Sequence, residues 1–83
     1  MITLTKEQVE KVYDELDRRI AFDIKEGDIP ANKPKWIEQE RRSRLDGVYG
    51  TMMALVPNSN WRDIVWWISE IEEKRYGKAW DSN

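Results

Sequence analysis

The sequence contains no cysteine and no histidine among its 83 residues. The lack of cysteine excludes disulfides, thiolate nucleophiles and zinc–thiolate sites. The lack of histidine removes the commonest general base and the commonest transition-metal ligand. No glycine-rich phosphate-binding motif is present, and none of the serines has an evident base. We therefore expect a protein without enzymatic activity and without a cofactor.

Paired carboxylates are the remaining pattern that could bind a metal. Asp14 with Asp17, and Glu70 with Glu73, are spaced i,i+3 in segments that read as helices. A di-metal site in a helical bundle projects its carboxylates inward and normally includes histidine. These four acids lie off the apolar stripes of their helices, which is typical of a solvated surface. We expect no metal site.

Long apolar runs are also absent, because no stretch approaches the roughly 20 residues that a membrane-spanning helix needs. The N-terminal stretch MITLTKEQ lacks the basic and apolar regions of a signal peptide. The formal net charge of −2 argues against a protein that is basic or strongly acidic overall. A small chain without disulfides is typical of the cell interior. We expect a soluble, cytoplasmic protein that folds as one domain over residues 1–83 and does not contact a membrane.

Several residues mark the ends of helices. Thr5 and Gln8 have the spacing of a capping box at the start of a first helix. Gly27 is a suitable stop for that helix, and Gly77 is a suitable stop for the last one. Asn60 is a predicted N-cap of the third helix, because an asparagine side-chain oxygen readily accepts a hydrogen bond from an unpaired backbone N–H of a first turn.

Apolar residues recur at the 3.6-residue spacing of helices, and no segment shows the sustained alternation of a strand. The sequence therefore predicts an all-α fold, a small three-helix bundle with helices over about 5–26, 34–56 and 60–76. The predicted core stripes are Val9, Val12, Tyr13, Leu16, Ile20 and Ile24, then Ile37, Leu45, Val48, Met52, Leu55 and Val56, then Trp61, Ile64, Val65, Ile68 and Ile71.

The second predicted helix contains two glycines, Gly47 and Gly50. Each costs about 1 kcal/mol relative to alanine inside a helix. The helix is either continuous and closely packed at the glycines, within the bundle or against a second copy, or it is broken near the LDG stretch. We favour the continuous, closely packed helix.

Two aromatic side chains do not fit the core pattern. Adjacent helical residues point about 100° apart, so Trp66 and Trp67 cannot both centre on one buried face. A helical wheel places Trp67 at the margin of the core stripe and Trp66 almost opposite its centre, and it places Phe22 in the same way on the first helix. One interpretation is that Trp80 and the tail, or a charged side chain, cover these rings. The other is that they bind a partner, because tryptophan is enriched at interface hot spots.

A basic run follows the first predicted loop and has Trp36 within it. Its members are Lys33, Lys35, Arg41, Arg42 and Arg44. Such side chains can contact phosphates while an aromatic ring stacks on a base. However, Glu38 and Glu40 interrupt the run, at spacings that suit i,i+4 ion pairs with Arg42 and Arg44. The run is therefore compatible with a nucleic-acid interface or with a solvated helix face.

The main hypothesis is a small, non-enzymatic protein–protein interaction module that binds a larger protein or associates with itself. The predicted contact residues are Trp66, Phe22, Trp36, Arg41, Arg42 and Arg44. In size and composition the chain is broadly similar to small phage or mobile-element proteins that act as inhibitors or adaptors. The alternative is a nucleic-acid-binding bundle whose contacts are Lys33, Lys35, Arg41, Arg42 and Arg44.

Overall fold

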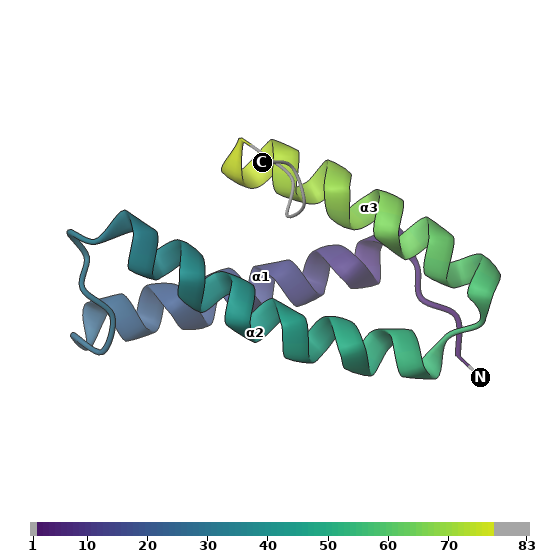
Figure 1. Cartoon of the computed structure of the whole chain (residues 1–83), viewed down its shortest axis with the longest axis horizontal. Coiled ribbons are helices and arrows are strands. Elements are labelled where there is room, and N and C mark those ends of the chain that lie inside the picture. Colours follow the sequence, from purple (N-terminus) through teal and green to yellow (C-terminus); the bar gives the residue numbers. More distant parts are fainter. Residues whose placement is uncertain (1, 78–83) are drawn as a thin grey trace.

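Three helices arranged up, down and up make the fold (Figure 1). A computed structural model describes residues 2–77. The helices are α1 (Lys6–Lys25), α2 (Pro34–Leu55) and α3 (Asn58–Tyr76), and the described residues contain no strand. The prediction of an all-α three-helix bundle is confirmed, and the predicted ends differ from the observed ends by at most two residues. None of these helices combines the length and apolarity needed to cross a membrane.

The predicted capping box at the start of α1 is present. The Gln8 amide donates to the Thr5 hydroxyl at 3.2 Å, and the Thr5 amide donates to the Gln8 side chain at 2.9 Å. Two glycines follow the ends of α1 and α3 as predicted, with φ of 84° at Gly27 and 82° at Gly77. These left-handed conformations are accessible to glycine without steric cost, so the two helices end where the sequence indicates.

The predicted N-cap role of Asn60 is wrong. Helix α3 begins two residues earlier, at Asn58, and is preceded by Pro57. The Asn60 side chain is buried, where it accepts from the Leu4 amide at 2.7 Å and donates to the Leu4 carbonyl at 2.9 Å. It thereby ties the segment before α1 to the first turn of α3. An amide side chain suits this position because it can satisfy a backbone donor and a backbone acceptor together.

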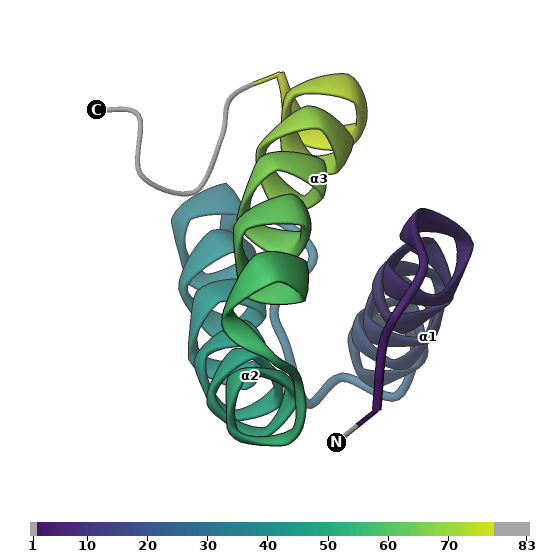
Figure 2. The same ribbon diagram turned by 90° about the vertical axis from the view of Figure 1, so that its right-hand side faces the viewer.

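The core is built from buried residues of all three helices. In the end view of Figure 2, α1 lies to one side of α2 and α3. Helix α1 packs closely against both α2 and α3, whereas α2 and α3 pack less closely against one another. Of the predicted core residues, Val9, Tyr13, Leu16, Ile20, Leu45, Met52, Val56, Ile64, Ile68 and Ile71 are buried. Four predicted core residues are instead exposed, namely Val48, Leu55, Trp61 and Val65. At these four positions, no neighbouring helix covers the apolar stripe of the helix that carries them.

Helix α2 is continuous through its glycines, as we favoured, but the expected close packing inside the bundle is wrong. A Cβ atom added at Gly47 or Gly50 would meet no heavy atom within 4 Å in the described part of the chain. The glycines therefore face open space. Packing within the bundle therefore does not offset the cost of these glycines to the helix. Of the two places that we considered for close packing, only a contact with a second copy remains.

Candidate protein-binding groove between α2 and α3

A groove of about 400 Å³ runs between α2 and α3. These two helices pack less closely against one another than either packs against α1. Apolar and aromatic side chains dominate its lining, and charged or polar groups stand among them. The lining residues are Leu45, Asp46 and Tyr49 from α2, and Arg62, Val65, Trp66, Ile68 and Ser69 from α3.

Trp66 is the most exposed large apolar side chain described, with 66% of its surface accessible. Its neighbour Trp67 is half-buried and packs against the core, as the helical wheel predicted. The ion pair with Lys6, at 2.7 Å, lowers the pKa of Glu70, and the Trp66 indole N–H adds to this effect. The Trp66 ring itself lines the groove.

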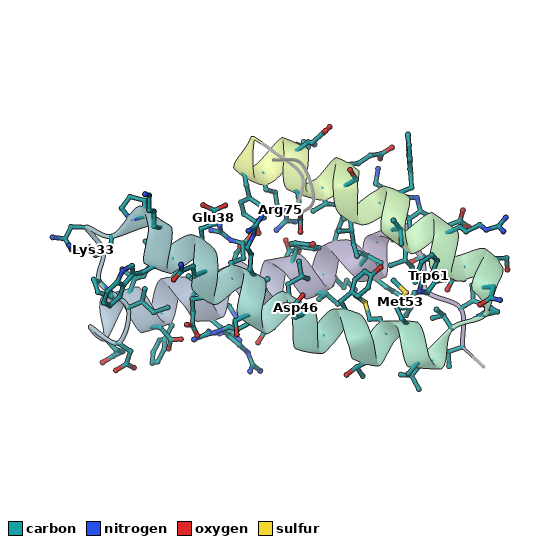
Figure 3. The ribbon with its side chains drawn as sticks, viewed as in Figure 1. Lys33, Glu38, Asp46, Met53, Trp61 and Arg75 are labelled. Atoms are coloured by element: carbon teal, nitrogen blue, oxygen red, sulfur yellow. The ribbon has the colours of Figure 1, made fainter. Side chains whose placement is uncertain are left out.

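Two opposite charges stand on the two walls of the groove. Asp46 lies midway along α2 (Figure 3), and Arg62 lies near the start of α3. Both residues are exposed, and neither forms an ion pair or side-chain hydrogen bond with any residue of the 2–77 segment.

A buried hydrogen bond joins α1 to α3. The Tyr13 hydroxyl donates to the Glu72 carboxylate at 2.5 Å, and both side chains are buried. Burial raises the pKa of the Tyr13 phenol well above its usual range, and the bond to Glu72 raises it further. Because Glu72 follows Ile68 by one helical turn, this bond fixes the rotation of α3 about its axis. That rotation leaves Trp66 on the outer side.

An ionic cluster around Asp17 joins the last turn of α3 to both other helices. Arg75 donates to Asp14 at 2.6 Å and to Asp17 at 3.1 Å, while the Tyr76 hydroxyl donates to Asp17 at 2.6 Å. The Arg41 guanidinium lies over the Tyr76 ring, 3.9 Å from its centroid, with its Nε 3.6 Å from Asp17. This cluster links the last turn of α3, where Arg75 lies (Figure 3), to α1 and α2.

The three predicted aromatic anchors do not form one surface. Phe22 and Trp36 are each 58% exposed, as expected for residues off the core stripe. Phe22 lies near the end of α1 and Trp36 near the start of α2, so both lie at the end of the bundle where α1 connects to α2 (Figure 1). Trp36 lines a separate small hollow with residues that include Ile29 and Ser43. Only Trp66 lines the groove between α2 and α3.

The predicted arginine contacts are largely engaged within the protein. Arg41 interacts with Asp17 as described above, and Arg44 forms ion pairs with Asp23 and, at 3.0 Å, with Glu40. The Glu40–Arg44 pair is the i,i+4 interaction expected for a solvated helix face. Arg42 also has an interaction partner. Lys33 and Lys35 are exposed, and Lys33 lies at the tip of the α1–α2 connection (Figure 3).

A wider trough of about 840 Å³ on another face is lined by residues of α1 and α2. Its floor includes Leu16 and Met52, and Gly47 opens one side. Its rim charges are mostly paired: Arg19 with Glu15 at 2.8 Å, and Arg44 with Asp23 and Glu40. The trough therefore offers fewer free charges to a partner than the α2–α3 groove does.

Sequence reasoning missed the groove charges Asp46 and Arg62 and the buried acid Glu72. Glu72 had a detectable signal, because it falls on the helical wheel beside Ile68 on the buried side of α3. Asp46 and Arg62 had none, since each is an ordinary surface charge until α2 and α3 are placed side by side. Within residues 2–77, no group of three carboxylates is arranged to hold a metal ion. Comparison with protein-family models, curated proteins and solved structures finds no match to this chain.

Proposed function

We propose that this protein is a non-enzymatic protein–protein interaction module, of the inhibitor or adaptor kind, that binds a larger protein through the α2–α3 groove. The observation that carries the proposal is Trp66, two-thirds exposed at the edge of a groove whose lining is mainly apolar. A tryptophan in this position gives a partner a large apolar contact at low entropic cost.

The shape of the groove supports a helical ligand. Two antiparallel helices form its walls, and such grooves accept the apolar face of a third helix through side chains spaced i, i+3, i+4 and i+7. Leu45 and Ile68 form the apolar base, where a partner side chain would be shielded from water. Asp46 and Arg62 flank this base and can orient the ligand through charge.

The remaining predicted contacts have a smaller part in this proposal. Phe22 and Trp36 are available to a partner that extends to the connected ends of α1 and α2. Arg41 and Arg44 would have to exchange internal ion pairs for partner contacts, which reduces their net contribution. The same internal pairs weaken the case for a nucleic-acid interface, because counterion release requires cations that are free to meet phosphates.

The experiment compares partner capture by three forms of the intact protein: wild type, Trp66→Ala and Leu55→Ala. Leu55 is 50% exposed and does not line the groove, so its variant controls for loss of an exposed apolar side chain. We expect a protein captured by wild type and Leu55→Ala to be lost or strongly depleted with Trp66→Ala. Equal capture by all three forms would contradict the proposal.

A stability measurement accompanies the capture experiment. Because Trp66 is two-thirds exposed, Trp66→Ala should leave helicity and the thermal midpoint nearly unchanged. A large loss of stability would show instead that the ring is part of the core. In that case the comparison would be repeated with Trp66→Leu, which keeps an apolar side chain at this position while removing the aromatic ring.

A further inference from the structure

The α1–α2 trough is a second concave surface, and it shares no lining residue with the α2–α3 groove. Its floor is apolar, because Leu16 and Met52 belong to the core and Val12 packs against it. Val48 adds an apolar side chain, 37% exposed, on the α2 wall. In such a hollow, apolar side chains of a partner would be shielded from water.

The α2 wall of the trough is low and carries little charge. Gly47, Val48 and Thr51 are exposed along it. A Cβ atom added at Gly47 would meet no heavy atom within 4 Å in the described part of the chain. Because glycine has no side chain, the backbone of an entering helix can approach α2 closely at this position.

The α1 wall carries an excess of positive charge. Arg18 and Arg19 share the carboxylate of Glu15, at 2.5 and 2.8 Å, and their hydrogen bonds lower the pKa of Glu15 to about 2. This ionised acid balances only one of the two cations, whose side chains remain 69% and 68% exposed. Lys11, two turns before Arg18, forms no ion pair within residues 2–77. These four residues thus present surplus positive charge in a chain whose net charge is −2.

The shape of the trough suits a helix with an apolar face and an acidic edge. The lining of α1 extends from Lys11 to Arg19, roughly 12 Å or two turns of helix at 1.5 Å per residue. A helix lying there can place apolar side chains spaced i, i+3, i+4 and i+7 on the floor. Carboxylates seven residues apart on its edge match the separation of Lys11 and Arg18 along α1.

A nucleic acid matches this surface less well. The trough has an apolar floor, and the one basic residue that lines its α2 wall is Arg44, which already pairs with Asp23 and Glu40. Phosphates need cations that are free to meet them, and here such cations lie along α1 only. The combination of apolar floor and one basic wall therefore favours a protein ligand.

We propose that the α1–α2 trough binds an acidic amphipathic helix of a second protein. The apolar face of this helix contacts the floor and Val48, and its carboxylates pair with Lys11 and with the exposed sides of Arg18 and Arg19. The inference goes beyond the proposed function, because it adds a binding surface on another face. A chain with both surfaces can join two proteins, as an adaptor does.

Two designed peptides that differ in the charge of one edge test the proposal. Each is an amphipathic helix of about 18 residues with leucines spaced i, i+3, i+4 and i+7; glutamates flank the leucines in one peptide and lysines in the other. Fluorescence anisotropy measures binding of each labelled peptide to the intact protein. We expect the acidic peptide to bind with a Kd below about 1 mM and the basic peptide to bind about tenfold more weakly or worse.

The expected preference runs against the net charge of the protein, which by itself favours the basic peptide. A preference for the acidic peptide therefore reports a local basic surface. Absence of saturable binding by the acidic peptide up to about 1 mM, or equal binding of both peptides, would overturn the proposal.

Single substitutions place the peptide on the protein. Lys11→Glu should weaken binding of the acidic peptide about fivefold or more, because an attraction becomes a repulsion. Lys35→Glu is the matched control: it makes the same change of net charge at an exposed lysine outside the trough, and it should change binding by less than about twofold. Val48→Gln removes apolar surface without adding charge and should weaken binding about threefold or more. All three positions are exposed, so circular dichroism should show an unchanged fold. Equal effects of the two lysine substitutions would contradict the proposed site.

Other occupants of the trough give different results. Analytical ultracentrifugation of the protein without peptide measures its mass against the 10.0 kDa of one chain. A dimer that Val48→Gln dissociates would assign the trough to a second copy and overturn the proposal.

The same peptide also separates the two surfaces of the protein. Binding that survives in Trp66→Ala but is weakened in Lys11→Glu supports the trough, whereas the opposite pattern would place the peptide in the α2–α3 groove and overturn the proposal. The proposed function fails separately, if Trp66→Ala captures every protein that Leu55→Ala captures.

Discussion

The phenolic hydroxyl of Tyr13 donates a 2.5 Å hydrogen bond to the carboxylate of Glu72, and both side chains are buried. This bond joins α1 to α3 across 59 residues of sequence. A buried carboxylate is stabilising only when its oxygens are satisfied, so the pair makes the rotation of α3 specific. The outward direction of Trp66 depends on that rotation.

Tyr13→Phe should lower the free energy of unfolding by about 1–3 kcal/mol, because the buried carboxylate loses a hydrogen-bond donor while the ring remains. Urea denaturation measures the change. Tyr49→Phe is the matched control, since the Tyr49 hydroxyl has no hydrogen bond within residues 2–77. Equal losses in both variants would show that the bond to Glu72 makes no particular contribution.

Stability should fall in strongly alkaline solution. Burial raises the pKa of the Tyr13 and Tyr76 phenols, and their bonds to Glu72 and Asp17 raise it further. Since the folded-state pKa exceeds the unfolded value of about 10, the stabilisation is complete below about pH 10 and is lost as the pH rises above it. Urea denaturation at increasing pH measures this loss, which should be smaller in a Tyr13→Phe/Tyr76→Phe variant. An identical alkaline decline in that variant would refute the assignment.

Gly47→Ala should raise the free energy of unfolding by about 0.5–1 kcal/mol, because alanine is the better helix former and the added Cβ meets open space. Gly27→Ala should have the opposite effect, since Gly27 has a φ of 84° that alanine adopts only with strain. Thermal or urea denaturation of both variants provides the comparison. A destabilised Gly47→Ala would mean that something packs against that side of α2.

Asn60→Ala should cost about 1–3 kcal/mol, because it leaves the Leu4 amide and carbonyl without their partly buried partners. Hydrogen exchange gives a local test, in which the Leu4 amide should lose protection while amides in the middle of α1 are affected less. Asn58→Ala is the control, since Asn58 is exposed at the start of α3. If Asn58→Ala were the more destabilising variant, the two hydrogen bonds between Asn60 and Leu4 would not be the main contribution of this turn to stability.

Much of the fold was predictable because helix signals are local. The capping box at Thr5 and Gln8, and the left-handed glycines at Gly27 and Gly77, depend only on neighbouring residues. Asn60 shows the limit of such signals: the residue type suits an N-cap, but a more distant backbone segment uses its side chain instead. Trp80, which we considered as a cover for Trp66, lies outside the described residues.

The sequence by itself determined the three helices, most of their ends and the placement of Trp66 opposite the apolar stripe of its own helix, because the 100° step of a helix fixes how side chains are arranged around its axis. Only the tertiary structure decided that α2 and α3 pack loosely enough to leave a groove, with Asp46 and Arg62 on its walls. It also decided that Val65 and Trp61 are exposed and that Glu72 is buried. The physical reason is that periodicity defines an apolar stripe, whereas the spacing of neighbouring helices defines how much of that stripe is covered.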